Sequence, residues 1–147
     1  MENKLTIVQE GALPALIRLM ASPDEDTVVQ CCVVIRNLAV NAGNKVKIIQ
    51  AGALKPILRL LSESTLKVKE NACAALQNLS VNLECKNRII DEGGVRLLVR
   101  LLQAPVPSLQ EHASGTMRAT FLQWMRLTTP LFLKEDFRPS SISFAAL

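Results

Sequence analysis

The chain contains few side chains that could perform chemistry. It has one histidine, His112, and four cysteines among 147 residues. No nucleophile motif, glycine-rich phosphate loop or metal-ligand spacing accompanies them, so we interpret His112 as a surface polar contact. The cysteines lack CxxC spacing and are predicted to be free, buried thiols: Cys31, Cys32, Cys73 and Cys85. We therefore predict that this chain is not an enzyme and has no catalytic residues, metal site or cofactor.

Two asparagines are the more informative polar residues. Asn37 and Asn78 are each followed by leucine, and the interval between them is the one at which the rest of the chain repeats. An asparagine amide both donates and accepts hydrogen bonds, so it can hold a peptide backbone unit whatever side chain that unit carries. The alternative is that each amide satisfies free carbonyls at the C-terminal end of a helix.

The repeat is clearest in three glycine-led blocks. Residues 11–20 read GALPALIRLM, residues 52–61 read GALKPILRLL and residues 93–102 read GGVRLLVRLL. Their period of about 41 residues lies within the range of about 20–50 that is the signature of a solenoid, whose units bury their apolar faces only by stacking. We predict one repeat domain over residues 1–120, with repeats at about 3–43, 44–84 and 85–120.

Each repeat is predicted to contain three helices. A short first helix, at residues 3–9, 44–50 and 85–91, ends at a glycine that turns the chain in a left-handed conformation. The second helix, at about 13–20, 54–61 and 95–102, has the spacing of one apolar stripe. The third helix, at about 26–40 and 66–81, should receive Ser, Asp or Thr N-caps. One arginine recurs in every second helix, and we expect a row that is solvated or paired with carboxylates, with an anion-binding ladder as the alternative: Arg18, Arg59 and Arg100.

This repeat unit resembles the armadillo repeat over about residues 3–118. The likeness is carried by the three glycines, the leucine-rich second helices, and the Asn-Leu pairs of the third helices. It implies an all-α, right-handed solenoid of three helices per repeat, whose third helices line a groove for extended peptides. The implied groove residues, by family likeness and helical spacing, are Gln30, Val33, Arg36, Asn37, Asn71, Gln77, Asn78 and His112.

Two departures from the family pattern limit this implication. Nuclear-import adaptors with this fold usually place a tryptophan one turn before the asparagine, where this chain has Val33 and Ala74. Recognition of a basic nuclear-localisation signal is therefore not expected. The third repeat has Ala119 in place of the asparagine, followed by Thr120 where leucine is expected, and Gly115 should cost its helix about 1 kcal/mol.

Composition bounds the partners and the compartment. The chain is 49% hydrophobic and 20% charged, with a net charge of +4 and no run of Lys or Arg. This argues for a folded protein and against nucleic-acid binding. We expect no small-molecule substrate. No signal peptide or membrane span is expected, and free thiols predict a cytoplasmic or nuclear location, or both.

The C-terminal segment 121–147 differs from the rest, because all five aromatic side chains lie there. We predict that helix persists to about Arg126 and that the chain beyond Thr128 is irregular or disordered. The segment is interpreted as a cap on the third repeat, a motif for another protein, or an unrelated sequence joined to a shortened solenoid, as in a splice variant.

The predicted function is a non-catalytic scaffold that binds extended segments of other proteins. One alternative is a shortened isoform or fragment of a larger solenoid with little binding of its own. Another is the substrate-recruiting module of a ubiquitin ligase. End-to-end self-association through the open ends of the stack is a further expectation.

Overall fold

A computed structural model describes residue 6 and residues 8–134, with side chains described up to residue 128. This part of the chain is helical and contains no strand. Thr6, Val8 and Gln9 are helical, and the remainder of the expected first helix lies outside the described residues. The helices that follow are α2 (Ala12–Leu19), α3 (Glu25–Leu38), α4 (Ala42–Gln50), α5 (Leu54–Glu63), α6 (Leu66–Leu79), α7 (Leu83–Asp91), α8 (Gly94–Gln103) and α9 (Pro107–Lys134).

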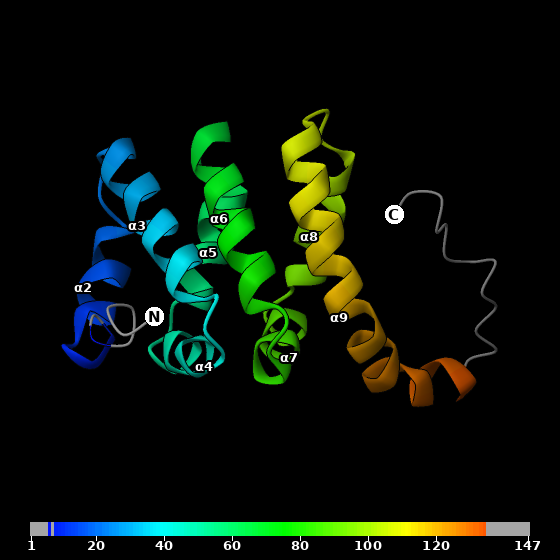
Figure 1. The fold of residues 1–147 in the computed structure, drawn as a ribbon. Coiled ribbons are helices and arrows are strands. Elements are labelled where there is room, and N and C mark those ends of the chain that lie inside the picture. The colour runs from blue at the N-terminus through cyan, green and yellow to red at the C-terminus, as the bar shows by residue number, and fades with distance from the viewer. Residues whose placement is uncertain (1–5, 7, 135–147) are drawn as a thin grey trace.

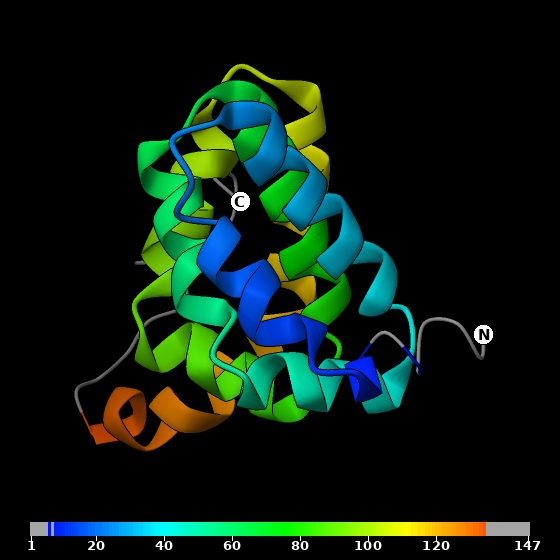
Figure 2. The ribbon, with the colours of Figure 1, turned by 90° about the vertical axis from the view of Figure 1, so that its left-hand side faces the viewer.

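The helices form a stack of layers. Figure 1 shows α3, α6 and α9 side by side in front, with α2, α5 and α8 behind them and α4 and α7 along the lower edge. Figure 2 shows the stack from its N-terminal end, so that the layer of third helices and the layer of second helices can be distinguished. The third helices pack against one another, α3 on α6 and α6 on α9, so the stack is an all-α solenoid as predicted.

Three glycines set the turn between first and second helices. Gly11, Gly52 and Gly93 have φ angles of 78°, 88° and 78°, in the left-handed region that side chains rarely adopt. The prediction from the repeated glycine is therefore confirmed. Without this turn the first and second helices would run on as one, and the three-helix unit would be lost.

The core runs through the middle of the stack. Its largest fully buried side chains are apolar and come from all three repeats, and they include Ile35, Ile57, Leu76, Leu79 and Leu98. The four cysteines are also buried, as predicted, and none is in a disulfide. Burial raises the pKa of all four thiols, to about 12 for Cys32, Cys73 and Cys85. These thiols are therefore neutral packing groups near pH 7.

The N-caps differ in part from the prediction. Asp24 caps α3 by accepting hydrogen bonds from Thr27, from its hydroxyl and from its backbone N–H at 2.9 Å. These bonds hold the pKa of Asp24 below its ordinary value. Thr65, by contrast, precedes α6 without a side-chain capping bond, so that prediction is wrong. Because α6 is held on both sides by α3 and α9, it needs no local cap.

Asparagines cap the short first helices, which the sequence analysis did not anticipate. The side chain of Asn41 accepts from the Asn44 N–H at 3.1 Å, and that of Asn82 accepts from the Cys85 N–H at 3.1 Å. The signal was present, since Asn41 and Asn82 occupy the same position in successive repeats. These caps also explain why α3 and α6 end at Leu38 and Leu79, two residues before the predicted ends. An N-cap asparagine requires extended backbone, so the preceding helix must stop first.

Helix α9 corrects the prediction for the C-terminal segment. It continues without a break from Pro107 to Lys134, past the expected end at Arg126 and past Thr128. The position equivalent to Asn41 and Asn82 is Gln123, which is a poor N-cap, so nothing stops α9 and starts a new first helix. Instead α9 bends in its last turns (Figure 1), where Pro130 removes one helical hydrogen bond. The expectation for residues 135–147 lies outside the described residues.

Candidate interaction surface on the third helices

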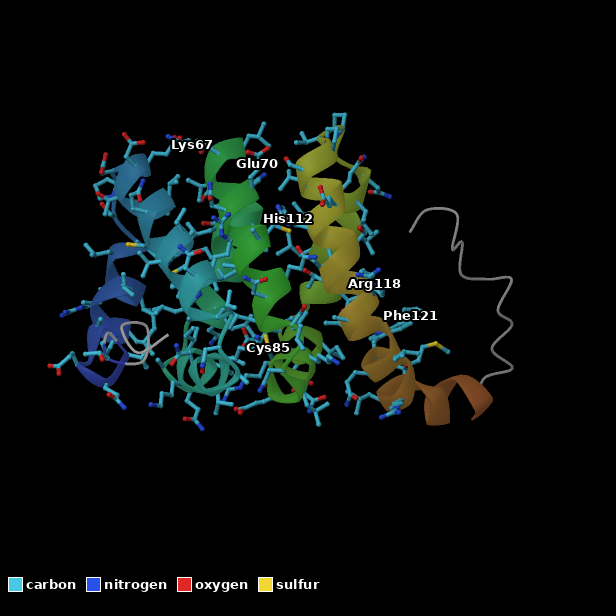
Figure 3. The ribbon with its side chains drawn as sticks, in the orientation of Figure 1. Lys67, Glu70, Cys85, His112, Arg118 and Phe121 are labelled. Atoms are coloured by element: carbon cyan, nitrogen blue, oxygen red, sulfur yellow. The ribbon has the colours of Figure 1, made fainter. Side chains whose placement is uncertain are left out.

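The eight predicted groove residues all lie on α3, α6 and α9. We call the surface formed by these three helices the third-helix face (Figure 3). None of the eight is fully buried. Gln30 and Asn37 are exposed, and the other six are half-buried: Val33, Arg36, Asn71, Gln77, Asn78 and His112. The structure therefore leaves all of them at the surface, although several are held by neighbours.

Asn78 has a structural bond across the repeat. Its side-chain Nδ2 donates to the backbone carbonyl of Arg36 at 3.0 Å, and this carbonyl lies in the last turn of α3. The carbonyls of a last turn have no partner within their own helix, so Asn78 satisfies one from the neighbouring repeat. The amide keeps its Oδ1 and its second N–H. Asn78 therefore uses part of its hydrogen-bonding capacity within the fold. This matches the alternative raised from the sequence, in which the amide satisfies a free carbonyl at the C-terminal end of a helix, except that the helix belongs to the neighbouring repeat.

Asn37 differs from Asn78 because no third helix precedes α3 among the described residues. Its side chain is exposed and has no hydrogen bond within the described residues. Asn71 is intermediate, since its Nδ2 donates to the Lys67 carbonyl of its own helix at 2.9 Å. Of the three asparagines, Asn37 is the most available to a ligand.

Gln77 and His112 are brought together from α6 and α9. His112 Nδ1 and Gln77 Oε1 are 2.8 Å apart, and Figure 3 shows His112 on the side of α9 that faces α6. Gln77 also lies over Gly115, where a Cβ atom would be 2.1 Å from Gln77 Nε2. The missing side chain at Gly115 therefore makes room for the Gln77–His112 pair. The space that the Gln77 side chain needs explains why glycine is present here despite its expected cost to helix stability.

A hollow opens beside this pair. Its volume is about 350 Å³, and it is lined by Gln77, Glu111, Ser114, Gly115 and Arg118. Glu111, Ser114 and Arg118 lie on one face of α9, at the i, i+3 and i+7 spacing of a helix. The sequence analysis did not name these three residues. The sequence contained a signal for them, because their helical spacing places them on the same side of the helix as His112 and Gly115.

The hydroxyl groups of α9 are accommodated within the helix. Thr116 and Thr120 are fully buried. Thr116 Oγ1 donates to the His112 carbonyl and Thr120 Oγ1 to the Thr116 carbonyl, each at 2.9 Å. This back-bonding lets threonine occupy the position where leucine is expected. The departure at Thr120 therefore does not disrupt the repeat.

Two polar ties link the N-terminal ends of the third helices. Lys67 Nζ is 2.9 Å from Asp26 Oδ1, and the Ser108 hydroxyl donates to Glu70. Both members of the Lys67–Asp26 pair are well exposed, so water screens the pair and it adds little to stability. Its two members occupy the same position in successive repeats and are opposite in charge, a signal that could have predicted it.

The recurrent arginines lie on the other layer. Arg18, Arg59 and Arg100 are exposed on α2, α5 and α8 and form no ion pair within the described part of the chain. They therefore match the solvated form of the expected row. Among the same residues there is no cluster of three potential metal ligands, and no helix is long and apolar enough to span a membrane.

The layers, the positive-φ glycines and the stacked third helices define a three-helix-per-repeat α-solenoid. A sequence model of the Armadillo/beta-catenin-like repeat matches residues 1–40, 41–81 and 82–118. The chain belongs to the armadillo repeat family. No curated protein sequence matches it.

Solved structures agree with this assignment. Computationally designed armadillo repeat proteins for modular peptide recognition match with a TM-score of 0.76 and 29% identity, over 80% of this chain and 50% of that chain. A designed armadillo repeat protein in complex with the peptide (KR)4 matches with a TM-score of 0.75 and 27% identity, over 81% of this chain and 51% of that chain. This chain thus spans about half the length of these designed proteins. Armadillo repeat domains are typically non-catalytic protein-interaction scaffolds.

Proposed function

We propose that this chain binds an extended segment of another protein along the third-helix face, without catalysis. The observation that carries the proposal is the row of surface amides on adjacent third helices, Asn37 on α3 and Gln77 and Asn78 on α6. Amide side chains on adjacent helices can form hydrogen bonds with successive backbone units of an extended peptide, because the peptide presents alternating donors and acceptors. The designed relative bound to a peptide supports this use of the fold.

The experiment is a quantitative pull-down from cell lysate with the intact chain and with Asn37→Ala. Because the Asn37 side chain is exposed and has no bond in the described structure, its removal should leave the fold unchanged. Asn78→Ala removes the bond to Arg36 as well, so it is compared only after circular dichroism shows equal helix content. Gln103→Ala, an exposed amide on α8, is the matched control.

The expected result is a set of partners lost from Asn37→Ala and from Asn37→Ala/Asn78→Ala but kept by Gln103→Ala. Identical partner sets for all variants would reject a role for the asparagines. An empty set for every variant would favour the alternative of a shortened isoform or fragment whose binding surface lies in other repeats. A substrate-recruiting module of a ubiquitin ligase would instead show partners that become ubiquitylated in the cell.

Self-association through the open end of the stack has one specific observation in its favour. Leu19 on α2 is 46% exposed, whereas the equivalent Leu60 and Leu101 are 7% and 4% exposed in the repeats that have a preceding neighbour. An uncovered apolar position of this kind favours contact with another repeat end. Sedimentation velocity should show concentration-dependent association that weakens in Leu19→Gln. A concentration-independent monomer would reject it.

We also propose a cytoplasmic or nuclear location, or both. The four buried cysteines without disulfides support it, because thiols persist in reducing compartments. Imaging of the tagged chain in cells tests this, and secretion into the medium would contradict it.

A further inference from the structure

The two ends of the third-helix face differ in charge. The N-terminal halves of α3, α6 and the matching part of α9 carry four acidic residues and two lysines: Glu25, Asp26, Glu70, Glu111, Lys67 and Lys69. The equivalent C-terminal segments, residues 33–40, 74–81 and 115–122, contain no Asp or Glu and two arginines. We call this second half the basic half of the face. It is also the half that contains Asn37, Gln77 and Asn78.

The two arginines occupy one repeat position. Arg36 on α3 and Arg118 on α9 are each one repeat period away from Gln77 on α6. Arg36 is half-buried and Arg118 is exposed, and neither forms an ion pair within the described residues. The acidic residues nearer the other end are partly engaged, since Asp26 pairs with Lys67 and Glu70 accepts from Ser108. The guanidinium groups are thus the uncompensated charges of the basic half.

Helix electrostatics alone do not explain both arginines. Arg36 lies in the last turn of α3, where a cation is favoured by the helix dipole. Arg118 has no such reason, because α9 continues to Lys134 and leaves Arg118 well inside the helix. Arg118 instead lines the hollow beside Gln77 and Gly115. Glu111 lines the same hollow two turns earlier in α9. Arg118 is therefore the basic residue of the hollow, and it lies at the end nearer the amides of Gln77 and Asn78.

The spacing of the arginines sets the length of a matching ligand. Neighbouring packed helices are about 8–10 Å apart, so two repeats span about 16–20 Å. An extended chain rises about 3.3 Å per residue, which corresponds to five or six residues over that span. Arginine presents a planar set of donors that matches a carboxylate.

We propose that the third-helix face selects acidic peptides, with two carboxylates five or six residues apart contacting Arg36 and Arg118. The intervening backbone lies over Gln77 and the two asparagines. This inference rests on the proposed groove function and adds the chemistry of the ligand. It gives this chain a ligand whose charge is opposite to that of the (KR)4 peptide in the complex of the designed protein.

Fluorescence anisotropy with the full chain tests the inference. The probes are labelled ten-residue Ser/Ala peptides that carry two Glu residues five apart, the same peptide with Gln at both positions, the same with Lys, and (KR)4. We expect the Glu peptide to bind about fivefold to twentyfold more tightly than the Gln peptide, and the Lys peptide and (KR)4 more weakly than both. The preference for Glu should shrink as salt is raised.

Two double variants separate local contact from net charge. Arg36→Gln/Arg118→Gln replaces both arginines with glutamine, the residue type that the second repeat has at the same position (Gln77). This double variant should lose the preference for Glu, while the Gln peptide still binds. Arg59→Gln/Arg100→Gln makes the same change in net charge on α5 and α8 and should keep the preference. Equal losses from both double variants would overturn the inference in favour of long-range attraction.

The remaining outcomes distinguish the inference from the proposed function. One outcome is that the Gln peptide binds the intact chain but not Asn37→Ala, and that the Glu peptide binds no more tightly than the Gln peptide. This result would support the groove and overturn the charge preference. A preference for Lys or (KR)4 would overturn it in the same way. If no peptide binds the intact chain, the groove and the preference both fail.

Discussion

Helices α6 and α9 occupy the same place in successive repeats, yet one ends after 14 residues and the other continues for 28. After α6 the chain reads Ser80–Val81–Asn82, and Asn82 caps a new short helix. After the equivalent point in α9 it reads Phe121–Leu122–Gln123, and the helix does not stop. At this position the second repeat has an asparagine that caps a new short helix, whereas the third has Gln123 and α9 continues.

The two helices also differ in their neighbours. Helix α6 packs between α3 and α9, whereas α9 packs on α6, α7 and α8. Leu76 on α6 is fully buried and its equivalent, Met117 on α9, is 7% exposed. The second half of α9 leaves Leu122 68% exposed, and the Gln123 side chain instead donates to Asn87 on α7 at 2.8 Å. The central repeat should therefore carry most of the stability.

The largest expected effect is a core truncation on α6. Leu76→Ala should lower the free energy of unfolding by about 3–5 kcal/mol, since it leaves a cavity at a fully buried site. Met117→Ala should cost about 2 kcal/mol, because its site can collapse more easily. Urea unfolding followed by circular dichroism measures both. Equal losses would contradict a stabilising role that is concentrated in the second repeat.

Alkaline pH should weaken the fold through its buried thiols, of which Cys32, Cys73 and Cys85 share the same raised pKa. Cys32 and Cys73 share one repeat position, which in α9 is the exposed Ser114. Their folded pKa is about 12 against an ordinary value of 9.0, so the unfolded chain ionises first and the free energy of unfolding falls as pH rises above about 9. The limiting slope is about 1.4 kcal/mol per pH unit for each thiol. Cys73→Ala should reduce the slope, and urea midpoints from pH 8 to 10.5 provide the test; an unchanged slope would exclude Cys73 as a source.

A buried amide in the second repeat offers a stabilising change. Asn44 is fully buried, and neither polar atom of its side chain has a hydrogen-bond partner within the described residues. The third repeat carries the buried Cys85 at the equivalent position. Asn44→Cys should therefore raise the free energy of unfolding by about 1–3 kcal/mol. A lower melting temperature would mean that the amide has a partner, such as a water molecule, that the cysteine cannot replace.

The capping asparagine should have a smaller effect. Asn82→Ala removes the acceptor for the Cys85 N–H and should cost about 1 kcal/mol. Gln123→Ala, at the equivalent place in α9, removes no cap and should cost less than half as much. Thermal melts of the two variants compare them directly. A larger loss at Gln123 would show that its bond to Asn87 anchors the end of the stack.

The smallest expected change in stability is at the Gln77–His112 pair. Gly115→Ala gains about 1 kcal/mol of helix propensity but displaces the Gln77 side chain, so the net change should be near zero. The same variant should weaken peptide binding, because it fills the hollow beside Arg118. Melting temperature and anisotropy are measured together, with Gly43→Ala on α4, outside the hollow, as the control. Unchanged binding would separate the hollow from the ligand site.

The sequence by itself determined the repeat and its helices. The fixed period and the apolar stripes recur in each copy, and a left-handed turn is a local backbone demand that glycine meets alone. The third-helix surface positions followed from the same periodicity, because a helix face is set by residue spacing. The positions of the predicted groove residues at the surface could therefore be anticipated from their phase.

The tertiary structure decided which polar groups are committed and which are free. Asn37 and Asn78 share one repeat position and the leucine that follows, yet Asn78 bonds to the preceding third helix, α3, and no third helix precedes α3 among the described residues to accept a bond from Asn37. The bond between Gln77 and His112 and the space above Gly115 depend on how α6 and α9 pack. The extent of α9 past the predicted end at Arg126 is likewise seen only in the structure. Spacing along a chain fixes a face, whereas a hydrogen-bond partner on another helix requires the distance between the two helices.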